Sequence, residues 1–441
     1  MYFLVFLLHG LIFNIPSLLP ITFAVSAMFF FITYKKMKKH VSKMSSRFLI
    51  LMCYALPFSW RNLFGGDYGS LPISWFYLFG FMFIISLFFS KHDWNFSKRL
   101  FPIFITAFLS LIYSFLPLVI SNWSYRSQAV SQFIVILFNF IMVIGALFRN
   151  RSLTELNLTT FKKVFILGGY YTALMLIIQF VLYRYVGFEF GKIDFLLNRE
   201  LFYYLFSDVS HGTLYLALTI FCAFDFLKTL HGKEKNKYIF FMLVSLIGCA
   251  VTSARTGLYV LFVFLFLYIL IKQKGFVRKF VSVIAFIILI TVAFKLLMIV
   301  RPQTDLSQAL SSSGRTNGYL AALQLLFEHP FVGYGFSRDY ISSLLGFEIP
   351  HLSILQYAVH GGILYSFLLY LNQLLIYSYA AKNKSIFAWL IAIIVVGTCL
   401  VPDMFATRFL TIITMVALME PSHNLERVPF FCHKFFQISN T

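Results

Sequence analysis

Long apolar runs recur along the whole chain, and they constrain its fold more than any other feature. Hydrophobic residues make up 60% of the 441 residues and charged residues only 12%, whereas soluble domains carry about 25% charged residues. Runs near 20 apolar residues have the length that crosses a bilayer as a helix. The runs are continuous, whereas a transmembrane β-barrel needs short alternating segments. The sequence therefore predicts an all-α polytopic membrane protein with a single membrane-embedded domain over residues 1–441.

We expect about 14 transmembrane helices, with a range of 12–14. The first apolar run, 2–34, is too long for one span, and Pro16 and Pro20 divide it. It lacks a basic region and a small-residue cleavage site, so we expect an uncleaved first span. Segment 48–62 is short, and whether it is a full span stays open. The expected spans are 2–15, 20–34, 48–62, 72–90, 100–120, 130–148, 164–186, 211–227, 238–253, 256–271, 280–300, 352–381, 385–400 and 404–419.

Basic residues lie mainly in short loops between alternate spans. Of the 36 lysines and arginines, 25 fall in loops that share one predicted side. This is the positive-inside pattern of membrane proteins, so the formal charge of +20 indicates topology and argues against nucleic-acid binding. Both termini, with a tail over 420–441, are then cytoplasmic. Residues 1–250 form an N-terminal transmembrane bundle, and the 301–350 loop lies outside.

Lysine predominates on the expected cytoplasmic side and arginine on the other. The cytoplasmic set holds 19 lysines and 6 arginines, and the external set holds 9 arginines and 2 lysines. Topology requires positive charge inside but does not require arginine outside. Guanidinium groups bind phosphate and carboxylate in a bidentate manner, which indicates an anionic ligand at the outer surface. The alternative is that these arginines pair with the external acids.

The longest polar interruption runs over 301–362, and we expect the working part of the protein there, with 301–351 as an external catalytic loop. Within it, 313–319 opens an amphipathic segment that ends before Pro330. We predict a surface helix with Arg315 at its N-terminal end, where the helix dipole favours an anion. The alternative is a plain surface helix with a solvated arginine. The interruption also holds Arg301, Arg338 and three acids that could act as a base, Glu328, Asp339 and Glu348.

Arg255 lies in a very short connection between two spans, so it must sit near the membrane boundary. A charge there costs several kcal/mol unless it is paired or hydrated. We interpret it as a phosphate clamp for a lipid-linked substrate. The alternative is that its side chain extends to the lipid headgroups.

His351 follows Pro350 at the start of a long span. A helix N-terminus disfavours imidazolium and so lowers the pKa of this histidine. A neutral histidine at the membrane surface can act as a general base, although a capping or interfacial histidine is the alternative. His360 faces the opposite side of the same helix, and we expect it to be structural.

The chain lacks the motifs of several enzyme classes. It has no DxD motif for a metal-held nucleotide sugar, no Walker motif and no GxSxG motif. No Cys/His pair has the spacing of a zinc site, and none of the five cysteines falls in an expected outer loop. We therefore expect no metal, no cofactor and no disulfide framework.

Three motifs occur in a recognisable order: SARTG at 253–257, SGRTNGYLAALQLLFEHPFVGYGF at 313–336 and PHLSILQYAVHGGILYS at 350–366. Together they resemble the O-antigen polymerase and O-antigen ligase superfamily over about residues 250–370. The resemblance implies a metal-independent, inverting glycosyltransferase embedded in the bacterial inner (cytoplasmic) membrane. Its donor would be an undecaprenyl-pyrophosphate-linked oligosaccharide. The reaction would take place on the outer face of that membrane, with membrane lipids as further partners.

The resemblance also implies roles for residues. Arg255 and Arg315 would bind the pyrophosphate and stabilise its departure, and His351 would orient or deprotonate the acceptor hydroxyl. The family often has asparagine after this histidine, whereas this chain has Leu352, so that role is unassigned here. The further candidates for substrate binding are Arg338, Arg301, Glu328, Tyr319 and Gly335.

Several functions remain open at this point. The leading interpretation is a polymerase of O-antigen in lipopolysaccharide biosynthesis, with a chain-length regulator protein as a further partner. The nearest alternative is the ligase that transfers the finished chain to lipid A-core. A lipid-linked oligosaccharide flippase or other transporter should instead hold its charges at the bilayer midplane. A non-catalytic scaffold for polysaccharide assembly is the remaining interpretation.

Overall fold

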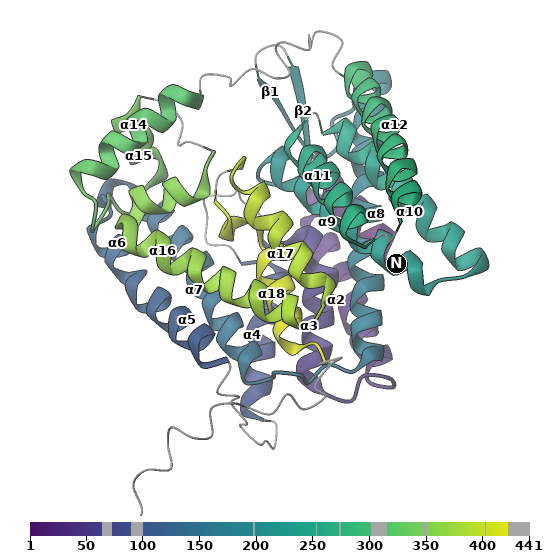
Figure 1. The fold of residues 1–441 in the computed structure, drawn as a ribbon, viewed down its shortest axis with the longest axis horizontal. Helices are drawn as coiled ribbons and strands as arrows, with labels where there is room; N and C mark the ends of the chain where they lie inside the picture. Colours follow the sequence, from purple (N-terminus) through teal and green to yellow (C-terminus); the bar gives the residue numbers. More distant parts are fainter. Residues whose placement is uncertain are drawn as a thin grey trace, which may run out of the picture.

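The computed structural model describes residues 1–63, 73–89, 100–196, 199–252, 254–272, 275–300, 315–346, 351–401 and 403–421. In these ranges the protein is a bundle of helices with one short hairpin (Figure 1). The first half contains α1 (Tyr2–Leu11), α2 (Leu19–Met37), α3 (Met44–Ala55), α4 (Trp75–Phe88), α5 (Phe101–Tyr113), α6 (Phe115–Ile120), α7 (Arg126–Leu147) and α8 (Glu155–Val181). After the hairpin come α9 (Val209–Phe226), α10 (Gly232–Val251), α11 (Thr256–Lys272), α12 (Phe276–Val300), α14 (Arg315–Glu328), α15 (Arg338–Leu345), α16 (Ser353–Lys382), α17 (Ile386–Gly397) and α18 (Phe409–Met419).

Six described helical stretches are long and apolar enough to cross a bilayer, which confirms a multi-pass, all-α membrane architecture. A described helix overlaps every span that the sequence predicts. The count of about 14 remains a prediction, because six described stretches meet the length and hydropathy of a span and most of the other apolar helices have only 10–17 residues. The six stretches are Pro16–Met37, Phe101–Ile120, Trp123–Leu147, Glu155–Val186, Val209–Thr229 and Ser353–Lys382.

The short helices α3 and α18 form part of the protein core. α3 has 12 residues, which makes it about 18 Å long, against a hydrocarbon thickness of about 30 Å. Leu49, Ile50 and Met52 point in different directions around it and are all fully buried. Every residue of α18 is buried as well. A helix that is apolar on all sides is enclosed either by other parts of the protein or by lipid. The apolar residues of 48–62 therefore reflect packing against protein as well as contact with lipid.

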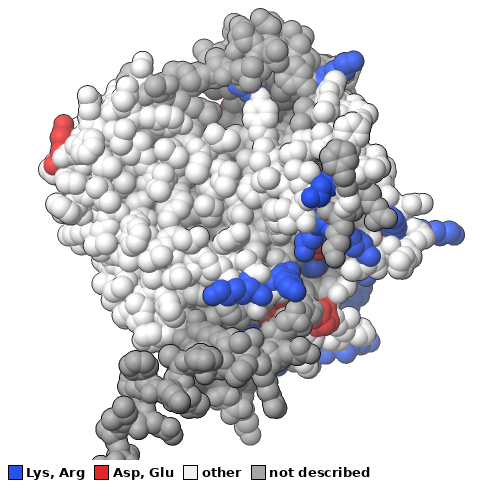
Figure 2. Space-filling model, in the orientation of Figure 1, with Lys and Arg blue, Asp and Glu red and all other residues white. Residues whose placement is uncertain are grey.

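Loops that the charge pattern assigns to the same side contact one another in the fold. At one end, Leu153 N donates to Met419 O at 3.0 Å and Lys43 Nζ donates to Ser152 O at 3.4 Å. At the other end, Trp60 Nε1 donates to Ala406 O at 3.2 Å. Figure 2 shows a broad face almost free of charge, with lysines and arginines gathered toward one edge. The fold thus has two ends, and the cytoplasmic or external side of each stays a prediction.

A β-hairpin lies between α8 and α9, where no strand is predicted from the sequence. Its antiparallel strands are β1 (Lys192–Leu196) and β2 (Arg199–Tyr204), with Ile193 opposite Phe202. The buried Gln179 of α8 joins the open end of the hairpin: its Nε2 donates to Lys192 O at 2.9 Å and its Oε1 accepts from Tyr204 N at 3.1 Å. The hairpin is therefore fixed to the bundle at the predicted external end.

Candidate functional site at one end of the bundle

α16 is interrupted at Gly362, whose φ of 85° and ψ of 171° lie outside the helical region. The interruption frees main-chain groups that need partners inside the bundle. The segment 330–335, which follows α14, supplies them. The bonds are Ile363 N to Pro330 O at 2.8 Å, Tyr334 N to Val359 O at 2.8 Å and Gly335 N to His360 O at 2.9 Å.

Glycines allow the two main chains to approach this closely. A Cβ on Gly362 would lie 2.3 Å from Phe331 O, one on Gly333 would lie 2.5 Å from Val359 O, and one on Gly335 would lie 2.6 Å from Ser121 Cα. All three glycines have positive φ, which favours glycine. This packing gives glycine at position 335 a structural role in the junction, and its role in substrate binding stays a prediction.

The junction is also tied to the first half of the chain. Tyr113 Oη donates to Phe331 O at 2.8 Å, and Phe336 N donates to Ser121 Oγ at 2.8 Å. Further along, Asp339 N donates to Gln128 Oε1 at 3.2 Å, and Gln128 Nε2 donates to the Asp339 carboxylate. Segments more than 200 residues apart therefore fix the polypeptide that leads into α15.

Arg338 begins α15, and its side chain is exposed. Among the residues that the structure describes, it forms no ion pair. In contrast, Arg184 contacts Glu200 at 2.8 Å and Lys192 contacts Asp194 at 3.1 Å. Pairing with external acids therefore holds for Arg184 and Lys192, whereas Arg338 has no such partner among the acids that the structure describes.

α14 is a helix that begins at Arg315, as predicted, and it packs on α16 (Figure 1). The side chain of Arg315, all of Arg301 and all of Glu348 lie outside the described residues. The apolar face of α14 is divided: Leu326 is buried against α16, whereas Leu320 is 57% and Phe327 75% exposed. An apolar surface of this kind suits a helix that lies at a membrane interface.

Glu328 ends α14 and is bound within the protein. Its Oε2 accepts a hydrogen bond from Tyr334 Oη at 2.5 Å. Burial and this hydrogen bond to a carboxylate raise the pKa of Tyr334 to about 12. Glu328 thus holds the end of α14 against the segment after it, which weakens its candidacy for the substrate.

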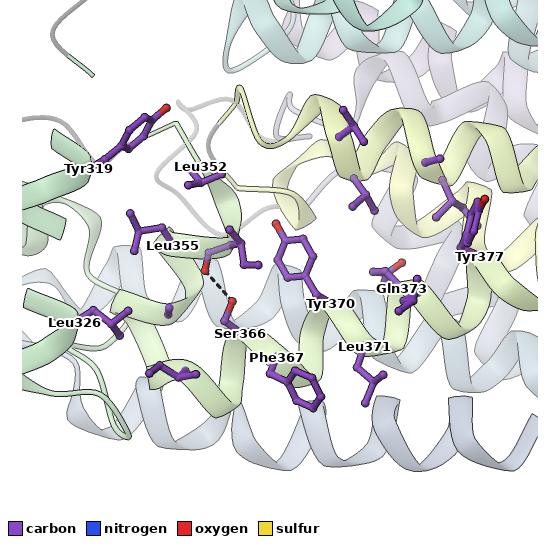
Figure 3. Close-up of a pocket in the computed structure, with 18 of the residues that line it drawn as sticks. Tyr319, Leu326, Leu352, Leu355, Ser366, Phe367, Tyr370, Leu371, Gln373 and Tyr377 are labelled. Atoms are coloured by element: carbon purple, nitrogen blue, oxygen red, sulfur yellow. Dashed lines mark hydrogen bonds between the residues drawn. The ribbon is translucent and has the colours of Figure 1, made fainter. Parts of the chain in front are cut away.

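An apolar groove of about 830 Å³ separates α14, α16 and α17 (Figure 3). Tyr319, the half-buried candidate on α14, lines one end of the groove beside Leu352. Ser366 points into it but already donates to Ile354 O at 2.7 Å. The groove therefore presents hydrocarbon along the length of α16, starting next to His351.

The start of α11, just after Arg255, and the residue His351 both approach the N-terminal part of α9. Arg255 precedes α11 and is half-buried; two residues later, Gly257 packs on α9, and a Cβ there would lie 2.3 Å from Thr213 O. Asp208 caps α9, its Oδ1 accepting from Ser210 N at 2.6 Å. The Asp208 carboxylate interacts electrostatically with His351, which comes from a segment about 140 residues further along the chain.

The environment of Asp208 keeps its carboxylate ionised. Burial raises the pKa of Asp208, but attraction to His211, the hydrogen bond from Ser210 and attraction to His351 outweigh it, so the pKa lies below its usual value. His211 is itself 3.3 Å from Ser207 Oγ through Nδ1. Sequence reasoning did not single out Asp208 or His211, because nothing local in the chain signals a contact with His351.

Among the described residues, no group of three or more His, Cys, Asp or Glu side chains could hold a metal ion. No protein-family model matches the chain, and a comparison with curated proteins found no match.

Proposed function

We propose that this protein is a polymerase of O-antigen or a related surface polysaccharide in the bacterial inner membrane. It would transfer a growing glycan from one undecaprenyl-pyrophosphate carrier to the non-reducing end of a new lipid-linked repeat unit. The observation that carries the proposal is the convergence of the helix after Arg255 and the residue His351 on one end of α9. The resemblance of the three motifs to polymerases and ligases supports it further.

The proposed step forms one bond and breaks one. The acceptor hydroxyl attacks the anomeric carbon of the donor glycan from the face opposite the carrier. The bond between that carbon and the pyrophosphate oxygen breaks with inversion, and undecaprenyl pyrophosphate leaves with the electron pair. His351 in its neutral form accepts the hydroxyl proton, and the nearby Asp208 carboxylate attracts the imidazolium that results. Arg255 and Arg315 stabilise the charge that develops on the pyrophosphate, which lowers the barrier because the charge is greatest after bond cleavage begins.

The apolar groove supports a lipid-linked donor. Its lining includes Tyr319, four residues after Arg315 on α14, and Leu352, which follows His351. Its wall is built from leucine, isoleucine, valine and alanine side chains of α16 and α17, which suits an isoprenoid chain. We propose that the first isoprene units of the carrier occupy this groove.

The position of the arginines disfavours a transporter. A transporter holds its charged groups at the bilayer midplane, between repeats. Arg255 lies between the ends of α10 and α11, and Arg315 is the first residue of α14. Both lie at helix ends, where a substrate at the membrane surface is within reach.

The proposal is tested by replacing Arg315 with alanine and, separately, with lysine in cells that lack the native copy. Arg126→Ala is a matched control, since Arg126 is an exposed arginine that begins α7. We expect Arg315→Ala to abolish the long-chain polysaccharide ladder at normal protein levels, Arg315→Lys to restore little, and Arg126→Ala to leave the ladder intact. A residual single capped unit identifies a polymerase, and glycan accumulating on the carrier identifies a ligase. A normal ladder from Arg315→Ala would overturn the proposal.

A further inference from the structure

The connection between α17 and α18, residues 398–408, holds two charged residues that are almost fully buried. Asp403 is 8% exposed and Arg408 3%. Their φ angles are +59° and +56°, a region that non-glycine residues seldom occupy. Left-handed backbone at a non-glycine residue costs about 1–3 kcal/mol, and buried charge inside a membrane protein costs more. Such features persist where surrounding contacts hold them, and they often accompany a functional role.

Asp403 is bound on all sides by α16 and by its own connection. Its Oδ1 accepts hydrogen bonds from Tyr357 Oη and, at 3.0 Å, from Ala406 N. Its main-chain N donates to Gln356 Oε1 at 2.8 Å. Phe405 N donates to the same Tyr357 hydroxyl at 3.2 Å. The carboxylate therefore fixes the start of α16 relative to the α17–α18 connection.

Hydrogen bonds continue from Gln356 to the junction at Gly335. Because Gln356 Oε1 accepts from Asp403 N, its Nε2 group faces His360 Nε2, 3.3 Å away, and donates to it. His360 Nδ1, at 2.6 Å, then donates to Gly335 O, which can only accept. This directional chain fixes His360 as the neutral tautomer with the proton on Nδ1. The buried His360 thus has a structural role, as the sequence predicts.

The same connection holds the residue next to His351. Ser353 N donates to Thr398 O at 3.1 Å, and Ser353 Oγ contacts Thr398 O at 2.9 Å and Val401 O at 3.1 Å. His351 lies two residues before Ser353, and Arg338 lies three residues after Gly335. The turn that leads to Arg338 and the entry of α16 after His351 are therefore both attached to residues 398–403.

We propose that Asp403 is a positioning residue for the glycosyl-transfer site. Its carboxylate holds the connection through Tyr357 Oη and Ala406 N. The connection held in this way reaches the turn before Arg338 through the hydrogen bonds of Asp403 N, Gln356 and His360, and it reaches the entry of α16 at His351 through Ser353. Asp403 touches no substrate in this scheme. The effect on transfer rests on the proposed function, whereas the effect on the placement of Arg338 does not.

The test compares Asp403→Ala and Asp403→Asn with Asp225→Ala. Asp225 lies in a polar cluster at the opposite end of α9, where it contacts Lys228 at 3.2 Å and accepts from Tyr268 Oη at 2.6 Å. It is a matched control for the loss of a partly buried carboxylate. Asparagine at 403 can still accept from Tyr357 and Ala406, so it is the conservative replacement.

Two readouts are measured at a temperature where all variants stay folded. The first is the transfer rate at saturating lipid-linked unit together with the KM. We expect Asp403→Ala to lower the transfer rate at least tenfold while the KM changes less than threefold. Asp403→Asn should recover most of the lost transfer rate, and Asp225→Ala should have the rate of the parent. The second is the alkylation rate of a cysteine placed by Arg338→Cys, which we expect to change at least threefold with Asp403→Ala and not with Asp225→Ala.

The outcomes separate this inference from the proposed function. If Asp403→Ala matches Asp225→Ala in both readouts, the positioning role is wrong even where Arg315→Ala abolishes transfer. If alkylation at position 338 changes while the parent chain transfers no glycan, the proposed function fails and the placement of Arg338 by Asp403 stands. The positioning role is also wrong if the transfer rates of Asp403→Ala and Asp225→Ala fall equally and each falls only in proportion to the loss of folded protein.

Discussion

Replacing Gly362 with alanine tests the junction between α16 and the segment 330–335. The φ of 85° and ψ of 171° at this position belong to a region that is essentially restricted to glycine, which costs other residues about 1–3 kcal/mol. The added Cβ would also lie 2.3 Å from Phe331 O and 2.4 Å from Phe331 C. Both are main-chain atoms, so the segment must move away from α16.

The movement carries a further cost. It breaks the hydrogen bond from Ile363 N to Pro330 O, and a buried group left without a partner costs about 1–3 kcal/mol. Together with the backbone strain, we expect Gly362→Ala to lose about 2–6 kcal/mol of unfolding free energy. The loss should appear as a lower midpoint of thermal unfolding of the detergent-purified protein.

Two other glycines serve as controls that distinguish the cost of backbone strain from the cost of the steric clash. Gly346 has a φ of +67° with nothing within 4 Å of a Cβ, so Gly346→Ala should lose only the strain, about 1–2 kcal/mol. Gly318 lies inside α14 with nothing near its Cβ, so Gly318→Ala should be neutral or stabilise by up to about 1 kcal/mol. If Gly362→Ala unfolds at the same temperature as Gly318→Ala, the segment is not inserted into α16 and the junction is wrong.

Three further predictions follow from the described contacts. Ser121→Ala removes the acceptor of Phe336 N and should cost about 1–3 kcal/mol in thermal unfolding, whereas exposed Ser124→Ala should cost nothing comparable. Ala392→Trp fills the groove and should weaken the binding of a long polyprenyl pyrophosphate at least tenfold, whereas the binding of a short-chain analogue should not change. If the variant binds the long-chain ligand as tightly as the parent does, the groove does not hold the carrier. The fold lowers the pKa of Asp208, so its carboxylate stabilises the protein at pH values above the unfolded pKa of about 4, and this stabilisation disappears as the pH falls through the lower pKa of the folded state. Asp208→Asn should therefore be less stable than the parent at pH 7. A stability difference that persists unchanged at acid pH would count against this explanation.

The sequence predicts much of the helical architecture because hydropathy is a local signal. α14 begins at Arg315 as expected, since its apolar spacing and the proline after it mark a helix of that length. Segment 48–62 shows the limit of the same signal. Its helix α3 is buried by other helices, and hydropathy does not distinguish a lipid environment from a protein one.

The candidate site was harder to predict because its geometry depends on distant pairs. The glycines at 333, 335 and 362 are visible in the sequence, but the close approach that each permits involves Val359, Ser121 and Phe331, respectively. Asp208 and Asp403 belong to no local motif, and their partners lie in α16 or just before it. The helix break at Gly362 went unpredicted for the same reason: two glycines within an apolar run do not reveal which segment fills the gap.

Binding of undecaprenyl pyrophosphate and of undecaprenol to the purified protein tests whether a pyrophosphate site lies at this end of the bundle. Arg255→Ala, Arg315→Ala and the control Arg126→Ala are compared with the parent chain. A charge-assisted hydrogen bond contributes about 1.5–3 kcal/mol, so each clamp arginine should supply at least tenfold in affinity. We expect the parent and Arg126→Ala to prefer the pyrophosphate at least about a hundredfold, and each of the two clamp variants to lose at least about a factor of ten of that preference. An undiminished preference in Arg255→Ala and Arg315→Ala would contradict a pyrophosphate site at this end of the bundle.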